Sequence, residues 1–109
     1  IKIMQLLNYI IADLNDNKAV DVISINVKKK TTITDHIIFA TGTSNRHIYS
    51  LSRSIYEKLK KIGYKNSVIE GDNNSGWIII DTGDVIVHLF KQESRDFYNL
   101  EKMWSAEIE

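Results

Sequence analysis

The chain has 109 residues with 43% hydrophobic content, which predicts one domain, residues 1–109, around one core. Its 14 basic and 14 acidic side chains give a net charge of zero, which excludes a protein that holds nucleic acid by its overall charge but leaves a local patch open. The absence of cysteine excludes disulfides, thiolate zinc sites and cysteine nucleophiles, and with no signal-peptide pattern and no apolar run near the roughly 20 residues of a membrane helix, we expect a cytoplasmic protein without membrane contact.

The first predicted element is an amphipathic helix that ends at about residues 15–17. Its apolar stripe follows intervals of three and four residues and contains Ile3, Leu6, Leu7, Ile10, Ile11 and Leu14. Two strands are predicted next, joined by a solvated turn at residues 28–30. Residues 22–27 alternate apolar and polar side chains as a half-buried strand does, whereas His36–Thr41 is more uniformly apolar. We expect these two strands to pair as an antiparallel hairpin.

A second helix is predicted after Gly42, which breaks the preceding strand. Ser44 or Asn45 can cap the start of this helix, and Gly63 can end it in a left-handed turn. Its inner stripe is expected to contain Ile48, Leu51, Ile55, Leu59 and Ile62.

The rest of the chain is predicted to form three strands and a final helix. Residues 67–70 form a short strand and residues 71–76 a polar turn, after which Trp77–Asp81 and Val85–Phe90 form a β-hairpin. The helical spacing of Phe97, Leu100 and Trp104 then predicts a helix that packs back over the sheet.

This order, α-β-β-α-β-β-β-α, predicts an α+β fold with a mixed sheet of about five strands. Each helix must bury its apolar stripe against the sheet, and we expect the helices mainly on one face. If all three predicted helices lie there, the other face of the sheet stays open for a partner.

The hairpin is predicted to present two chemically different faces. With Thr82 and Gly83 as a two-residue loop, Asp81 sits opposite Asp84 and Trp77 sits opposite His88. Alternation then places Ile78, Ile80, Val85, Val87 and Leu89 on an aliphatic face that belongs to the core. The opposite face carries Trp77, Ile79, Asp81, Asp84, Ile86, His88 and Phe90. This mixture of aromatic, acidic and aliphatic side chains suits a docking surface.

Each candidate docking residue also has a plainer interpretation. A tryptophan in a strand is often partly buried structure, although tryptophan is enriched among residues that dominate binding energy. Asp81 and Asp84 can be solvated turn residues, since aspartate favours such corners. Two facing carboxylates are unfavourable without a cation, however, and Glu70 and Asp72 can extend the same acidic rim toward a basic partner.

Catalytic motifs are weak in this sequence. Gly42, Thr43 and Ser44 lie between a strand and a helix and could present backbone N–H groups to a phosphate, but a helix cap is the simpler interpretation. A nucleotidyltransferase adds a carboxylate pair alternating on one strand, which holds two metal ions, whereas Asp81 and Asp84 are separated by a turn. The histidines show no metal-ligand spacing and lie in three elements: His36, His47 and His88. We therefore expect neither catalysis nor a bound metal or cofactor.

Four blocks of the sequence resemble the Iojap or ribosomal silencing factor family. They are TDHIIFATGTSNRH at residues 34–47, Glu70 with Gly71, WIIIDTGDVIVHLF at residues 77–90, and RDFYNLEKMW at residues 95–104. Each block alone is modest, but their order and spacing together are specific and cover nearly the whole chain.

The resemblance implies a nucleotidyltransferase-like fold without the catalytic carboxylates. It also implies a partner, large-subunit ribosomal protein fourteen, on the intersubunit face of the large ribosomal subunit. A protein at that position blocks joining of the small subunit and represses translation under nutrient limitation. The matching positions imply Glu70, Trp77, Asp81, Asp84 and His88 as partner-facing residues, and Arg95 and Tyr98 as their supports.

The net charge of zero favours binding to a ribosomal protein over binding to bare RNA, so we expect no direct nucleic-acid specificity. Two alternatives stay open. One is an enzyme that transfers a nucleotide to a small molecule, favoured by the glycine turn at residues 42–44. The other is a homodimer that uses the open sheet face, which is compatible with silencing if the free protein stores its docking surface in this way.

Overall fold

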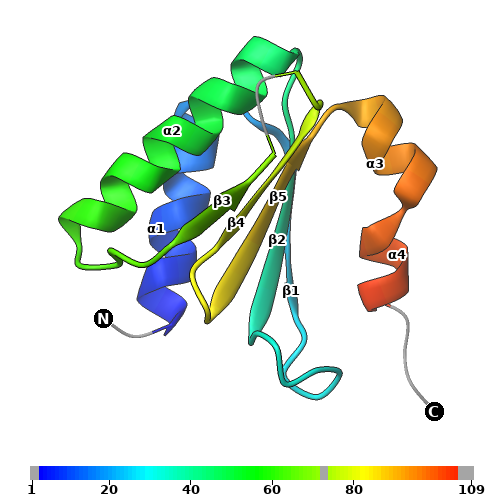
Figure 1. Ribbon diagram of the computed structural model, residues 1–109. Coiled ribbons are helices and arrows are strands. Elements are labelled where there is room, and N and C mark those ends of the chain that lie inside the picture. The colour runs from blue at the N-terminus through cyan, green and yellow to red at the C-terminus, as the bar shows by residue number, and fades with distance from the viewer. Residues whose placement is uncertain (1–2, 72–73, 106–109) are drawn as a thin grey trace.

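The computed structural model describes residues 3–71 and 74–105, which form a sheet with helices on both faces (Figure 1). The elements are α1 (Ile3–Asp16), β1 (Val20–Asn26), β2 (His36–Thr41), α2 (Asn45–Lys61), β3 (Val68–Glu70), β4 (Trp77–Asp81), β5 (Val85–Phe90), α3 (Gln92–Tyr98) and α4 (Leu100–Ser105). The predicted α+β class and the predicted order of strands are confirmed. In the described part of the chain, no helix is both long and apolar enough to cross a bilayer.

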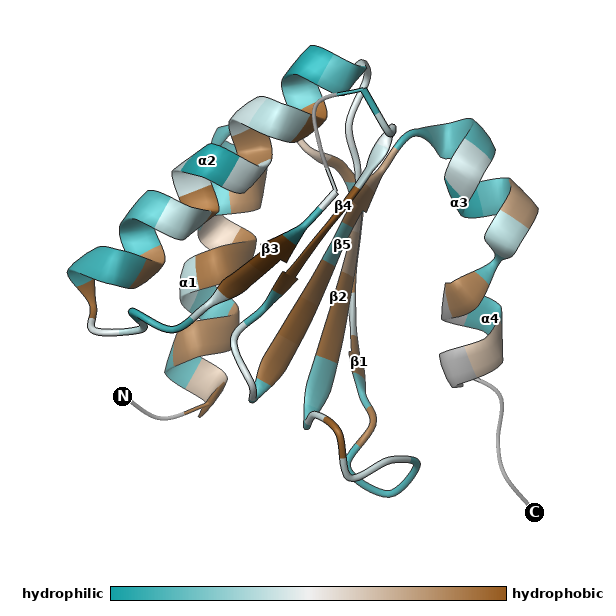
Figure 2. Ribbon diagram, viewed as in Figure 1, coloured by the Kyte–Doolittle hydropathy of each residue, from teal (hydrophilic) through white to brown (hydrophobic). Residues whose placement is uncertain are grey.

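The five strands lie in the order β1-β2-β5-β4-β3. Strands β2 and β5 pair in parallel at the centre, and the other neighbours are antiparallel, including the predicted hairpin of β1 with β2. A parallel pair needs a crossover connection, which α2, β3 and β4 supply. The central strands are largely buried on both faces, and Figure 2 shows them as largely hydrophobic.

The main core lies between the sheet and the helices α1 and α2. Four positions of the predicted α2 stripe are confirmed as core and are at most 1% exposed: Ile48, Leu51, Ile55 and Leu59. The fifth, Ile62, is only partly buried, at the edge of the core. The aliphatic face of the predicted hairpin is also confirmed as core: Ile78, Ile80, Val85, Val87 and Leu89. Burying each such side chain contributes about 1.5–3 kcal/mol.

The start of α2 is fixed by a tight approach of backbone to side chain. Ser44 is the N-cap, and its Oγ accepts a hydrogen bond of 3.0 Å from the backbone N–H of His47. A Cβ on Gly42 would lie 2.5 Å from Cγ1 of Ile48, so only glycine lets β2 pass this close to the helix. The predicted end of the helix is confirmed by Gly63, which has a φ of 99°.

The predicted register of the β4–β5 hairpin is wrong by two residues. The observed pairs are Trp77 with Phe90, Ile78 with Leu89, Ile79 with His88, Ile80 with Val87, and Asp81 with Ile86. Gly83 and Asp84 occupy the centre of the turn in place of Thr82 and Gly83, because the positive φ of 93° at Gly83 suits the first central position. A shift of two residues preserves alternation, so the two predicted faces are correct, but Asp81 and Asp84 do not oppose each other.

The C-terminal segment differs from the prediction in two ways. It forms two short helices because Asn99 adopts a left-handed conformation, with φ of 47°, and ends α3 there. Both helices lie on the opposite face of the sheet from α1 and α2 (Figure 1), so the condition for a fully open face is not met. Leu100 packs against a second apolar cluster on that face, formed by Val27, Ile37, Phe39 and Phe90. The packing of the Trp104 side chain lies outside the described part of the structure.

The close approach at Gly42 generates a stability prediction. Gly42→Ala should lower the free energy of unfolding by about 1–3 kcal/mol, because the new methyl group overpacks against Ile48. The loss should be smaller when Ile48→Ala has already removed the clashing atom, so the two changes should be less than additive in a double-mutant cycle measured by urea unfolding. Strict additivity would show that the clash with Ile48 is not the cause.

Candidate functional site

The second face of the sheet carries a cluster of aromatic rings, which we call the aromatic cluster: Phe39, Trp77, His88, Phe90 and Tyr98. The rings of Phe39 and His88 stack with centroids 5.2 Å apart. The ring of Tyr98, from α3, lies with its centroid 4.7 Å from that of Trp77. These contacts join β2, β4, β5 and α3 through a single set of rings.

His88 lies within this cluster, with only 9% of its surface exposed. The indole Nε1 of Trp77 donates a hydrogen bond of 3.1 Å to Nδ1 of His88, so the neutral imidazole carries its proton on Nε2. Burial lowers the pKa of His88 from 6.5 to about 4, because the charged imidazolium would lose its hydration. His88 therefore lies beside Trp77 on the neighbouring strand and supports its ring through this hydrogen bond.

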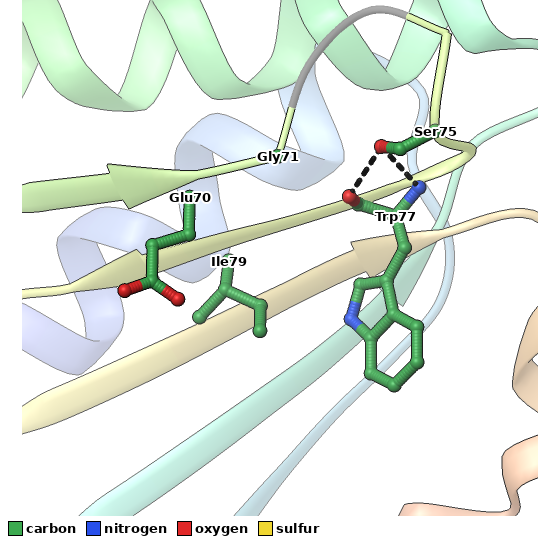
Figure 3. A pocket seen from close by; sticks show the side chains of 5 residues that line it. All are labelled: Glu70, Gly71, Ser75, Trp77 and Ile79. Atoms are coloured by element: carbon green, nitrogen blue, oxygen red, sulfur yellow. Dashed lines mark hydrogen bonds between the residues drawn. The ribbon is translucent and has the colours of Figure 1, made fainter.

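A groove runs beside the aromatic cluster over β3, β4 and β5, and we call it the β3–β5 groove. One part is lined by Val68, Glu70, Ile79, Asp81, Ile86 and His88, and the adjoining part by Glu70, Gly71, Ser75, Trp77 and Ile79. Figure 3 shows the side chains of Glu70, Ile79 and Trp77 on the same side of the sheet. The groove therefore has an aliphatic floor, an acidic edge and an aromatic end.

The backbone around Gly71 fixes the position of Trp77 in the groove. Gly71 has a φ of 99°, and a Cβ there would lie 2.5 Å from the carbonyl oxygen of Trp77. The Oγ of Ser75 donates to that carbonyl at 2.7 Å and accepts from the backbone N–H of Trp77 at 3.2 Å (Figure 3). The predicted acidic-rim residue Asp72 lies outside the described residues.

The two aspartates of the hairpin have different surroundings. Asp81 lines the groove, and its Oδ1 accepts a hydrogen bond of 2.8 Å from the backbone N–H of Gly83. Asp84 is exposed in the turn, and its carbonyl oxygen accepts from the backbone N–H groups of Asp35 and His36. The acidic edge of the groove is thus formed by Glu70 with Asp81, while Asp84 belongs to the turn.

Arg95 is a buried support that attaches α3 to the sheet. Only 4% of it is exposed, and its Nη1 donates to the carbonyl oxygen of Asp21 and to Oγ1 of Thr41, both at 2.8 Å. The Asp21 carbonyl is available because β1 is irregular there, with φ of 50° at Asp21. The guanidinium also lies over the ring of Phe90. By fixing α3, Arg95 holds Tyr98 against Trp77.

Sequence reasoning missed two of the residues that build this site. Phe39 stacks on His88, and the uniformly apolar strand 36–41 was a usable signal, because it indicates burial on both faces. Asp21 gave no signal, since an aspartate between apolar residues does not reveal a left-handed backbone.

The glycine turn before α2 is occupied by its own hydrogen bonds. The backbone N–H of Thr43 donates to Nδ1 of His47 at 3.0 Å, and Nε2 of His47 lies 2.9 Å from the carbonyl oxygen of Asn17. The N–H of His47 is used by the Ser44 cap. This geometry is a helix cap that joins α2 to the end of α1, and not a vacant phosphate cradle. Among residues 3–71 and 74–105, no three His, Asp or Glu side chains converge as a metal site requires.

Comparison with known proteins gives consistent matches. The family described as "Ribosomal silencing factor during starvation" matches residues 1–109. The protein named Ribosomal silencing factor RsfS of Haemophilus influenzae is 34% identical over 102 residues, which is 94% of this chain and 100% of that protein. The chloroplastic protein Iojap of Zea mays is 36% identical over 90 residues, 80% of this chain and 38% of the maize protein. A crystal structure of a Chromobacterium violaceum protein superposes with a TM-score of 0.91 at 34% identity, covering 100% of this chain and 91% of that one.

The buried neutral state of His88 predicts a pH-dependent stability. Between pH 6.5 and about 4 the unfolded chain binds a proton on this imidazole that the folded chain does not, so stability falls as the pH drops through this window. The loss attributable to His88 should be on the order of 3 kcal/mol at the acidic end. His88→Gln can still accept from Trp77 but does not titrate, so urea unfolding at pH 7 and pH 4.5 should show a smaller loss for this variant. Equal losses in both proteins would exclude His88 as the source.

Proposed function

This chain belongs to the ribosomal silencing factor family, and from that premise we propose its function. In the proposed function it binds the large ribosomal subunit through ribosomal protein fourteen and occupies space that the small subunit needs for joining. Translation is thereby repressed when nutrients are limiting. The observation that carries the proposal is the β3–β5 groove, the part of the second sheet face that α3 and α4 leave accessible.

The chemistry of the groove favours a basic protein segment as its occupant. Its floor contains the half-buried side chains of Ile79 and Ile86, and its edge contains the carboxylates of Glu70 and Asp81. A partner segment with aliphatic and basic side chains would bury apolar surface on the floor and meet opposite charge at the edge. The surface of a ribosomal protein offers such segments.

The aromatic end of the groove supplies a rigid anchor. Trp77 is half-buried, and its ring contacts the rings of His88 and Tyr98. A ring fixed by its neighbours loses little conformational freedom on binding, which is one reason why tryptophan and tyrosine dominate binding energies. Tyr98 remains 54% exposed, so it can contact a partner while it supports Trp77.

We assign different parts to the seven candidate residues. Glu70, Trp77, Asp81 and Tyr98 contact the partner, Asp84 lies at the margin of the contact, and His88 and Arg95 hold the others in place. Blocking subunit joining requires only an occupied surface, so the proposed function needs no catalytic group, metal or cofactor. We place this function in the cytoplasm, and a homodimer of the free protein through the same face stays a prediction that mass measurement in solution can check.

The direct test of the proposed function uses separated ribosomal subunits. The purified protein should co-sediment with large subunits and not with small subunits, and a stoichiometric excess should reduce the joined-ribosome peak in a sucrose gradient. Isolated ribosomal protein fourteen should compete with large subunits for binding to the purified protein. Unchanged subunit joining in the presence of bound protein would contradict steric blocking, and failure to co-sediment at all would remove the ribosome as partner.

A charge reversal at the groove tests the docking surface. Glu70→Lys places a like charge against a basic partner and should weaken large-subunit binding by about tenfold or more. Glu57→Lys is the matched control, because Glu57 is also exposed but lies on α2, where it pairs with Arg53. The control should bind within about twofold of the original protein and should unfold at a similar urea concentration. Equal weakening by the two variants would show a general charge effect and move the interface away from the groove.

A further inference from the structure

A second charged surface lies at the connection between β1 and β2, where three lysines follow one another. We call it the lysine turn: Lys28, Lys29 and Lys30. The carbonyl oxygen of Val27 accepts hydrogen bonds from the backbone N–H groups of Lys30, at 2.9 Å, and of Thr31, at 3.0 Å. The N–H of Lys28 donates to Oδ1 of Asn26 at 3.0 Å. The three charges are therefore gathered in one hydrogen-bonded turn.

The side chains of the lysine turn surround a hollow together with Asn26. Lys28 and Lys29 are exposed, and within the described residues neither ammonium group has a carboxylate partner, whereas Lys58 pairs with Asp13 and Lys91 with Glu93. Neighbouring like charges repel, and a bound anion relieves that repulsion. The hollow therefore suits a negatively charged group, and three ammonium groups suit a chain of such groups better than a single one.

The lysine turn lies at the same end of the sheet as the β4–β5 turn (Figure 1). The backbone N–H groups of Asp35 and His36 both donate to the carbonyl oxygen of Asp84, which ties the two connections together. Trp77 lies four residues up β4 from this end, a distance of roughly 13 Å, and β4 lies two strands from β2, roughly 10 Å. An interface of standard size, about 800 Å² per partner, spans roughly 30 Å, so a single partner can cover both the groove and the turn.

The groove and the turn carry opposite charges, and this favours a partner that is itself of mixed charge. We propose that the lysine turn binds backbone phosphates of ribosomal RNA on the large subunit, next to the protein segment that occupies the β3–β5 groove. This inference rests on the proposed function. Lysines act on phosphates as point charges and do not distinguish bases, so the contact adds affinity and orientation without sequence specificity. It is compatible with a net charge of zero, because acids and bases are separated in space instead of absent.

The test removes three charges at the lysine turn and, in a control, three charges elsewhere. The test variant is Lys28→Gln with Lys29→Gln and Lys30→Gln, and the control is Lys60→Gln with Lys61→Gln and Lys65→Gln, which are exposed at and beyond the end of α2. Binding to large subunits is measured at several salt concentrations. The test variant should bind about tenfold more weakly near 0.1 M salt, and its plot of log affinity against log salt should be shallower by about 2 to 3. The control should keep the original slope.

Isolated ribosomal protein fourteen separates this inference from the proposed function. The test variant should bind that protein as the original chain does, because the groove is unchanged. An unaltered affinity and slope for the subunit would overturn the RNA contact while leaving the proposed function in place, whereas failure of the original chain to bind subunits would overturn both. The last experiment is sedimentation with vesicles that contain anionic lipid. If the lysine turn is needed for binding to these vesicles but not for binding to the subunit, the turn belongs to a membrane contact and the inference is overturned.

Discussion

The parallel pairing of β2 with β5 is the constraint on which the rest of the structure depends. Both strands lie at the centre of the sheet, and their residues are apolar on both faces, so each face must be covered. Helices α1 and α2 cover one face with an aliphatic core. In the part of the chain that the structure describes, the other face carries two short helices, and its central part is closed by stacked rings. The aromatic cluster therefore closes this face of the sheet, which makes it part of the fold.

Covering the second face with rings creates the properties of the site. Burial lowers the pKa of His88 there, and the neutral imidazole accepts the indole hydrogen of Trp77 and stacks on Phe39. Arg95 brings its positive charge into the same layer, where the Asp21 carbonyl, Thr41 and the ring of Phe90 offset the loss of hydration. The outcome is a platform of packed rings beside an open groove. A platform of this kind can bind a partner without rearranging, which limits the entropy lost on binding.

Acidic and basic side chains are separated in space on this molecule, although its net charge is zero. The carboxylates of Glu70 and Asp81 border the groove, while Lys28 and Lys29 extend from the connection between β1 and β2. Each group alone is an ordinary solvated residue. In the proposed complex, these separate charges complement a particle built of both protein and RNA better than purely basic or purely acidic groups would.

The sequence by itself determined the strands, the first two helices, the faces of the hairpin strands and the family, because hydrophobic periodicity is local and each of the four motif blocks is contiguous in the chain. It also determined that Trp77 and Ile79 share a face, since alternation survives a register shift of two residues. It did not reveal that the last helix is divided at Asn99. Only the tertiary structure decided that Asp81 opposes Ile86, that His88 and Arg95 are buried, and that α3 lies across the sheet from α2. These features depend on which distant segments meet. The side chain of Arg95 donates a hydrogen bond to the carbonyl oxygen of Asp21, 74 residues away in the chain, and the left-handed backbone at Asp21 is not predicted by any side-chain pattern. Contacts between distant segments are settled by packing the whole molecule, so local preference alone could not place them.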